Sequence, residues 1–192
     1  MFKKGFKTWC ERASISTRRQ LGLQSFDPID LYKVAAIVEA DIKYPKDVPG
    51  LDKKFLKILT EEDPDSWSAI TIKIKQKIVI ILNSAHTKAR QMSSLGHELS
   101  HLIIGHPASK TGISADGLLI TGFDRLQEDE AGWLSGCLLL PHDACQYIKK
   151  TKMDQSSAQR HYGISADMYT YRMNASGVNR LWTPKVSSIK AK

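Results

Sequence analysis

Two histidines four residues apart, His97 and His101, constrain the fold of this chain more than any other feature. On a helix, residues at i and i+4 lie one above the other, so both imidazoles can reach a single metal ion. A helix is predicted over residues 87–105, because leucines recur there at helical spacing: Leu95, Leu99 and Leu102. A metal site also needs ligands from elsewhere, so another segment has to pack against this helix.

Glu98 follows the first histidine directly and completes an HExxH pattern. Its side chain sits beside the two imidazoles without being forced to coordinate the metal. It is therefore placed to take a proton from a metal-bound water, as the general base of a hydrolytic site. The alternative is two surface histidines on a solvated helix, with no metal between them.

The third ligand has to come from outside this motif. The extended HExxHxxGxxH pattern is absent, because Ile104 and Pro107 occupy its Gly and last His positions. His106 is nearby, but a histidine at a helix end is more often a C-terminal cation or a hydrogen-bonding loop residue. The better source is a second predicted helix, over residues 127–140.

That helix opens with acidic residues, including Glu128 and Glu130. One of these carboxylates would complete a site of two His and one Glu. Two positions along a helix rotate a side chain by about 200°, so only one can face the metal. Alternatively, the acidic first turn only favours the helix dipole.

The rest of the chain predicts an α+β fold, with helices packed on a small sheet of about three strands. Residues 69–75 alternate apolar and polar side chains, and residues 77–83 follow after a very short connection. Both segments are rich in β-branched residues, which predicts two strands in a hairpin or meander. A third short strand is expected at 118–121, in the long connection 106–124. That connection is either a lid over the site or a solvated loop.

The N-terminal segment predicts a basic amphipathic helix, with Phe2, Phe6, Trp9 and Ala13 at helical spacing. Docking on the body of the protein, with Trp9 as a core anchor, is the favoured interpretation. The alternative is contact with a membrane surface or an acidic partner.

The net charge of +8 belongs to the two ends of the 192-residue chain. Residues 1–20 carry +5 and residues 180–192 carry +4, which leaves the middle close to neutral. No apolar stretch could span a bilayer, and no signal peptide is evident. The three cysteines form no CxxC pair, which suits a reducing compartment. We therefore expect a soluble cytoplasmic protein with no membrane contact.

Residues 128–141, EDEAGWLSGCLLLP, resemble the E-x-E-A-[ND]-x-F-A-x-x-L-L-M-P segment of the ImmA/IrrE metallopeptidases. Residues 95–106 resemble the HExxH helix of that family, and residues 161–177 resemble its C-terminal segment. The resemblance covers residues 30–178. It implies a small zincin-like, gluzincin-type domain at 26–178, preceded by the basic helix at 1–25 and followed by a basic tail at 179–192.

By position, the resemblance assigns His97, His101 and Glu128 as ligands of one Zn²⁺ ion and Glu98 as the general base. Glu130 is the fallback ligand. The implied function is a stand-alone zinc endopeptidase that cleaves a partner regulator of the helix-turn-helix repressor type and thereby relieves repression. His161 and Tyr162 are candidate oxyanion or substrate contacts, and Tyr169 and Tyr171 are further candidates for the oxyanion donor.

The same sequence is compatible with two other functions. One is a DNA-binding regulator that uses residues 156–175 as a helix-turn-helix, although Arg172 is the only basic residue of its second helix. With so little positive charge there, no direct nucleic-acid binding is expected. The other is a zinc-containing protein that binds its regulator without cleaving it.

Overall fold

The computed structural model describes the chain except for residues 75, 108–110, 114–118, 122–123 and 182–192. The α-helices are α1 (Phe6–Gln20), α2 (Leu31–Ile37), α3 (Lys53–Lys57), α4 (Lys88–Ile104), α5 (Arg125–Leu139), α6 (His142–Thr151), α7 (Gln155–Tyr162), α8 (Ala166–Ala175) and α9 (Val178–Leu181). Short non-α turns are η1 (Pro45–Asp47), η2 (Ile58–Glu62) and η3 (Pro64–Ser66). The strands are β1 (Ala40–Lys43), β2 (Ala69–Ile74), β3 (Lys77–Leu82), β4 (Thr111–Ile113) and β5 (Leu119–Thr121).

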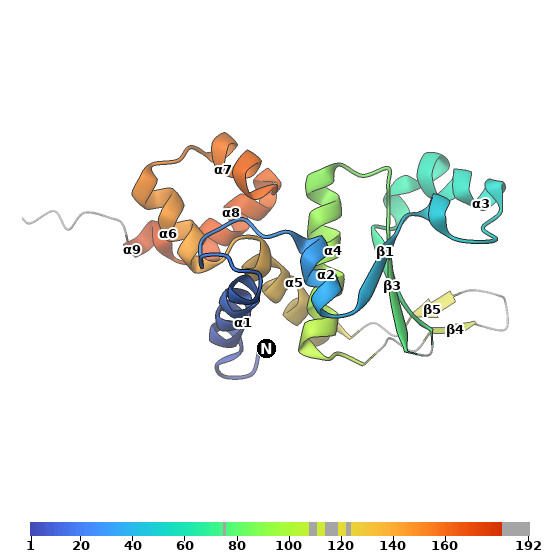
Figure 1. Ribbon diagram of the computed structural model, residues 1–192, viewed down its shortest axis with the longest axis horizontal. Coiled ribbons are helices and arrows are strands. Elements are labelled where there is room, and N and C mark those ends of the chain that lie inside the picture. The colour runs from blue at the N-terminus through green and yellow to red at the C-terminus, as the bar shows by residue number, and fades with distance from the viewer. Residues whose placement is uncertain (75, 108–110, 114–118, 122–123, 182–192) are drawn as a thin grey trace, which may run out of the picture.

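Helices pack on a small three-stranded sheet within the described residues, as the predicted α+β class requires. The strand order is β1-β3-β2, with β1 parallel and β2 antiparallel to the central strand. In β3, Ile80 and Leu82 are fully buried in the core that α4 shares with the sheet. Figure 1 shows α2 and α4 beside the strands and α6–α9 gathered on the opposite side of α4.

One strand of this sheet is not predicted by the sequence. β1 has only four residues, and only Ala40 among them is buried. Such a short segment carries little periodicity, and it forms a strand because β3 offers it a parallel partner. The strand expected at 118–121 corresponds to β5, which pairs with β4 in a separate hairpin; residue 118 lies outside the described part, as does much of the 106–124 connection.

Helix α4 has the boundaries expected from the sequence. The Thr87 hydroxyl accepts a hydrogen bond from the Arg90 N–H at its start, while Leu95 and Leu99 are fully buried along its inner face. The helix ends at Gly105, whose φ of 80° is the left-handed conformation that glycine adopts without strain.

Helix α5 contacts α4, α1 and α8, and its C-terminal part, residues 134–139, is buried on all sides. It begins at Arg125, two residues earlier than predicted, because the Asp124 carboxylate accepts hydrogen bonds from the N–H groups of Leu126 and Gln127. Its dense packing against α4 sets the position of the acidic first turn relative to the histidines.

Helix α1 docks on α5, as favoured from the sequence, and Phe6 and Ala13 of the expected stripe pack against the core, whereas Trp9 does not. Trp9 is 42% exposed, whereas Cys10, Ser14 and Arg18 are buried. The prediction that Trp9 anchors the core is therefore wrong. The buried polar groups are tolerated because α5 ends there with free carbonyls: Ser14 donates to the Cys137 oxygen at 2.6 Å and Arg18 to the Leu138 oxygen at 2.7 Å.

The two helices considered as a helix-turn-helix are α7 and α8. Arg172, the basic residue of α8, is fully buried and donates to Glu11 at 2.6 Å, so it is not available to a DNA phosphate. In the part of the chain that the structure describes, no helix has both the length and the apolar character needed to cross a bilayer. The division of the chain at residues 25 and 178 stays a prediction.

Candidate metal centre and active site

The two histidines of the HExxH motif lie on one face of α4 and turn the same ring nitrogen toward each other. The Nε2 atoms of His97 and His101 are 3.1 Å apart, and the ring centroids are 4.8 Å apart. This follows from the helical i, i+4 spacing, which stacks the side chains on consecutive turns.

Glu128 brings a carboxylate from the first turn of α5 to the same point. Its Oε2 lies 2.9 Å from His97 Nε2, and its Oε1 lies 3.5 Å from His101 Nε2. The potential ligand atoms of the three residues all lie within 4.8 Å of one another. The side chains are 22–34% exposed, so the group is partly accessible to solvent.

This group suits a metal ion by its donor chemistry. Two imidazole nitrogens and one carboxylate are the ligand set of a catalytic zinc, which keeps a further position open. Burial, followed by the neighbouring His97, lowers the pKa of His101 to about 4, against an opposing effect of Glu128. His101 is therefore neutral at pH 7, which is the form that binds a metal.

Glu98 lies beside this group and is held by a residue of the sheet. The Thr71 hydroxyl of β2 donates a hydrogen bond to Glu98 Oε2. Burial raises the pKa of Glu98, while the Thr71 hydrogen bond and His97 lower it and the charge of Glu128 raises it. A carboxylate with a raised pKa is better suited to exchange protons near neutral pH than an exposed one.

Glu130, the fallback ligand, points to a different partner. Its Oε2 lies 3.1 Å from Nε2 of His106, and it is not part of the three-residue group. The rotation between positions 128 and 130 of the helix accounts for this difference. His106 is not an exposed cation at the helix end, because its side chain is only 7% exposed and its Nδ1 lies 2.9 Å from Nδ1 of His101.

The candidate oxyanion contacts do not join this group among the interactions of the described residues. The Tyr162 hydroxyl donates to the Phe26 carbonyl at 2.9 Å, and its side chain is buried. His161 is exposed and packs edge-on against Tyr162. Tyr171 packs edge-on against Trp133.

Sequence reasoning missed two parts of the site. In the sequence Thr71 is only a polar position in an alternating strand, and nothing in its spacing connects it with Glu98, 27 residues further on. The pairing of His106 with Glu130 was also missed. A signal for it existed in the histidine just beyond the motif, but its partner is on another helix.

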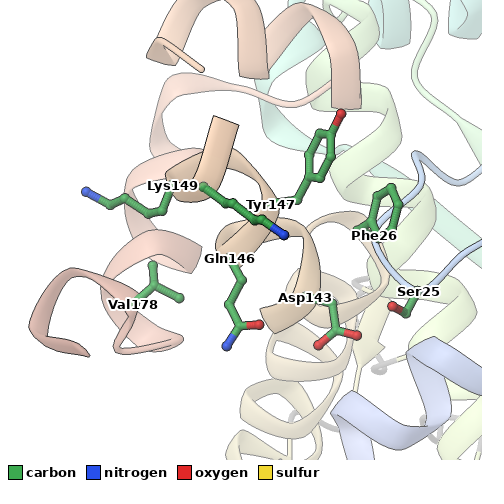
Figure 2. A pocket seen from close by; sticks show the side chains of 8 residues that line it. Ser25, Phe26, Asp143, Gln146, Tyr147, Lys149 and Val178 are labelled. Atoms are coloured by element: carbon green, nitrogen blue, oxygen red, sulfur yellow. The ribbon is translucent and has the colours of Figure 1, made fainter. Parts of the chain in front are cut away.

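A cavity of about 410 Å³ lies beside α6. None of its lining residues belongs to the group of His97, His101 and Glu128, which we call the metal group. The stacked rings of Phe26 and Tyr147, with centroids 4.7 Å apart, form part of its wall (Figure 2). The other lining residues are Ser25, Asp143, Gln146, Lys149, Lys150 and Val178.

Comparison with protein families gives an independent view of the same segment. Residues 57–174 match the family model Peptidase_M78, described as the IrrE N-terminal-like domain. A search of curated proteins finds no match. The matched segment covers more than half of the chain and includes α4, α5 and β2, which carry the histidines, Glu128, Glu98 and Thr71. The chain therefore belongs to the IrrE N-terminal-like family of peptidases.

Proposed function

We propose that this protein is a zinc-dependent endopeptidase whose substrate is a partner transcriptional regulator of the helix-turn-helix type. The observation that carries the proposal is the convergence of His97, His101 and Glu128 beside Glu98, in a chain of a peptidase family. The three proposed ligands come from two helices that pack against each other, so the packing of these helices fixes their relative position.

Two imidazoles and one carboxylate, partly accessible to solvent, favour zinc over harder cations that prefer oxygen ligands. When bound, zinc supplies Lewis acidity that polarises the scissile carbonyl and makes a water molecule more acidic. The ligands themselves hold that centre at a fixed place relative to Glu98.

Glu98 is the general base in this proposal. Its carboxylate accepts the proton of the attacking water and then delivers it to the leaving amine. The Thr71 hydrogen bond fixes one of its oxygens, and the other remains available for the proton. Since burial raises the pKa of Glu98, the carboxyl group can both gain and lose a proton during turnover.

The position of β2 suggests how a peptide would reach Glu98. Within the described residues β2 is an edge of its sheet, with β3 on one side. An extended peptide can add to such an edge by backbone hydrogen bonds. Because Thr71 of β2 contacts Glu98, a peptide paired along β2 would pass the general base.

The substrate class rests on the family resemblance, and the location rests on the thiols. Cys10, Cys137 and Cys145 are all unpaired and buried, which suits a reducing compartment. We accordingly place the protein in the cytoplasm, where a transcriptional regulator is accessible to it.

The test is to measure zinc content and cleavage of the regulator encoded beside the gene, with and without a chelator. Glu98→Gln should keep its zinc and lose cleavage, because an amide does not accept the proton. Glu128→Gln should lose zinc and cleavage together. Asp129→Asn is the matched control, since Asp129 is exposed on the same turn of α5 and should leave both unchanged.

Undiminished cleavage by zinc-loaded Glu98→Gln would contradict the assigned general base. Zinc binding and stable complex formation with the regulator, without any cleavage, would instead identify a protein that only sequesters its partner. A wild-type protein that binds no zinc would overturn the proposed metal centre.

A further inference from the structure

We propose that His106 and Glu130 are positioning residues that hold His101 in the tautomer presenting its Nε2 atom to the metal. The proposal rests on the metal centre of the proposed function. It assigns a role to two residues that the three-ligand group leaves out.

The three side chains form a continuous line of hydrogen-bonding atoms. His101 Nδ1 lies 2.9 Å from His106 Nδ1, and His106 Nε2 lies 3.1 Å from Glu130 Oε2. His101 thus uses its two ring nitrogens in opposite directions: Nε2 faces His97 and Glu128, and Nδ1 faces His106.

The positions of the protons follow from the chemistry of these groups. An ionised Glu130 can only accept, so His106 carries a proton on Nε2 and donates it. A neutral His106 then has an unprotonated Nδ1, which accepts from His101 Nδ1–H. His101 is thereby left with a free electron pair on Nε2, the atom that faces the other two ligands.

The end of α4 builds this arrangement. Gly105 adopts a left-handed conformation, and the His106 N–H donates to the His101 carbonyl at 3.0 Å. This is the backbone pattern of a Schellman turn, which folds the residue after the glycine back over the last turn of the helix. The turn brings the His106 ring next to the ring of His101, with centroids 5.0 Å apart.

The side chains of His106 and Glu130, which lie behind His101, are more shielded from water than the three proposed ligands. The side chains of His106 and Glu130 are 7% and 12% exposed, against 22–34% for the ligand side chains. A hydrogen bond shielded from water is stronger and orients its partners better than an exposed one. Hydrogen bonds of this kind behind a metal-ligating histidine fix the ring and raise its basicity.

The same geometry separates this role from two simpler ones. His106 is not a fourth ligand of the same ion, because it faces the opposite edge of the His101 ring from Nε2. It is not only a cap for the helix dipole either, because both of its ring nitrogens face other side chains.

The experiment measures the tautomer of His101 in the metal-free protein and the affinity for zinc. Long-range 1H–15N correlation spectra of the full chain report which ring nitrogen carries the proton. Zinc dissociation constants come from competition with a chelating dye, and the absorption spectrum of the cobalt-substituted protein reports ligand geometry. The variants are His106→Phe, Glu130→Leu and Glu130→Gln, with circular dichroism as the check of folding.

In the wild type, His101 should carry its proton on Nδ1. His106→Phe and Glu130→Leu should mix the two tautomers, weaken zinc binding by about 10–100-fold and alter the cobalt spectrum. Glu130→Gln should recover most of the affinity, because its amide oxygen still accepts from His106. His142→Phe is the matched control. It removes an imidazole that hydrogen-bonds to Gln146 on α6, outside the metal group, and it should change none of these readouts.

A wild-type His101 protonated on Nε2, or zinc affinities of both His106→Phe and Glu130→Leu within twofold of wild type, would overturn the proposal. If His106→Phe does not fold, Glu130→Leu decides the outcome with the His106 ring intact. A wild-type protein that binds no zinc would overturn both the proposed metal centre and the proposed role of His106 and Glu130 in positioning a metal ligand. The tautomer measurement still shows separately whether the hydrogen-bonded line exists.

Discussion

Gly96 of α4 lies against Ser135 of α5: a Cβ atom on Gly96 would be 2.7 Å from the Ser135 Oγ. The next residue along α4 is His97, and Ser135 lies two turns after Glu128 on α5. The distance between the two halves of the metal group therefore depends on a glycine at position 96.

Gly96→Ala should force the two helices apart and weaken zinc binding. Overpacking of this kind costs about 1–3 kcal/mol, which exceeds the gain of about 1 kcal/mol from replacing glycine inside a helix. We expect a lower melting temperature and a larger dissociation constant for zinc. The matched variant Gly96→Ala/Ser135→Ala removes the hydroxyl that would clash, and it should restore both; a double variant no better than the single would contradict the close approach as the cause.

Thr71→Val should shift the low-pH limb of peptidase activity to higher pH. Glu98 must be ionised to accept a proton, so activity falls as the pH falls through its pKa. The Thr71 hydroxyl lowers this pKa, against the larger effect of burial that raises it. Removing the hydroxyl therefore raises the pKa further.

The measurement is the pH dependence of kcat/KM for wild type, Thr71→Val and Thr71→Ser. Serine keeps the hydroxyl, so its profile should stay near that of the wild type. A shift to lower pH in the valine variant would show that the hydrogen bond does not stabilise the ionised form.

Glu11→Ala should destabilise the fold strongly, by about 3 kcal/mol, because it leaves the fully buried Arg172 without its carboxylate. Glu11 also accepts from the His142 N–H at 2.9 Å, so it joins α1, α6 and α8. Chemical denaturation measures the loss. Glu11→Gln keeps a hydrogen-bond acceptor, so its free energy of unfolding should fall by less. An equal decrease in the two variants would show that the charge of Glu11 is unimportant.

The three cysteines should be unreactive in the native protein. Burial raises the pKa of Cys10 to about 12 and that of Cys145 to about 11, and it also raises the pKa of Cys137. Thiolate is the reactive form, and these thiols lack both ionisation and access. A thiol-specific dye should label none of them in buffer and all three in denaturant; rapid labelling of the native protein would contradict their burial.

Local sequence patterns predict much of the fold. The helical spacing of the leucines in α4, the alternation in β2 and the β-branched residues of β3 are local signals, and the structure has elements at those places. β1 was missed because its strand conformation depends on pairing with β3, 38 residues away in the register. Trp9 was misplaced because amphipathic spacing does not reveal that carbonyls at the end of α5 can accept hydrogen bonds from Ser14 and Arg18.

The sequence by itself determined that His97 and His101 share one face of a helix with Glu98 beside them, because helical geometry requires only local spacing. The family resemblance named Glu128 as the acidic partner, with Glu130 as the fallback. Only the tertiary structure shows that Glu128 lies beside the two histidines and Glu130 beside His106, because this depends on how α5 is rotated against α4. The same packing brought Glu130 to His106 and, with β2, Thr71 to Glu98: contacts between distant segments, which no local pattern records.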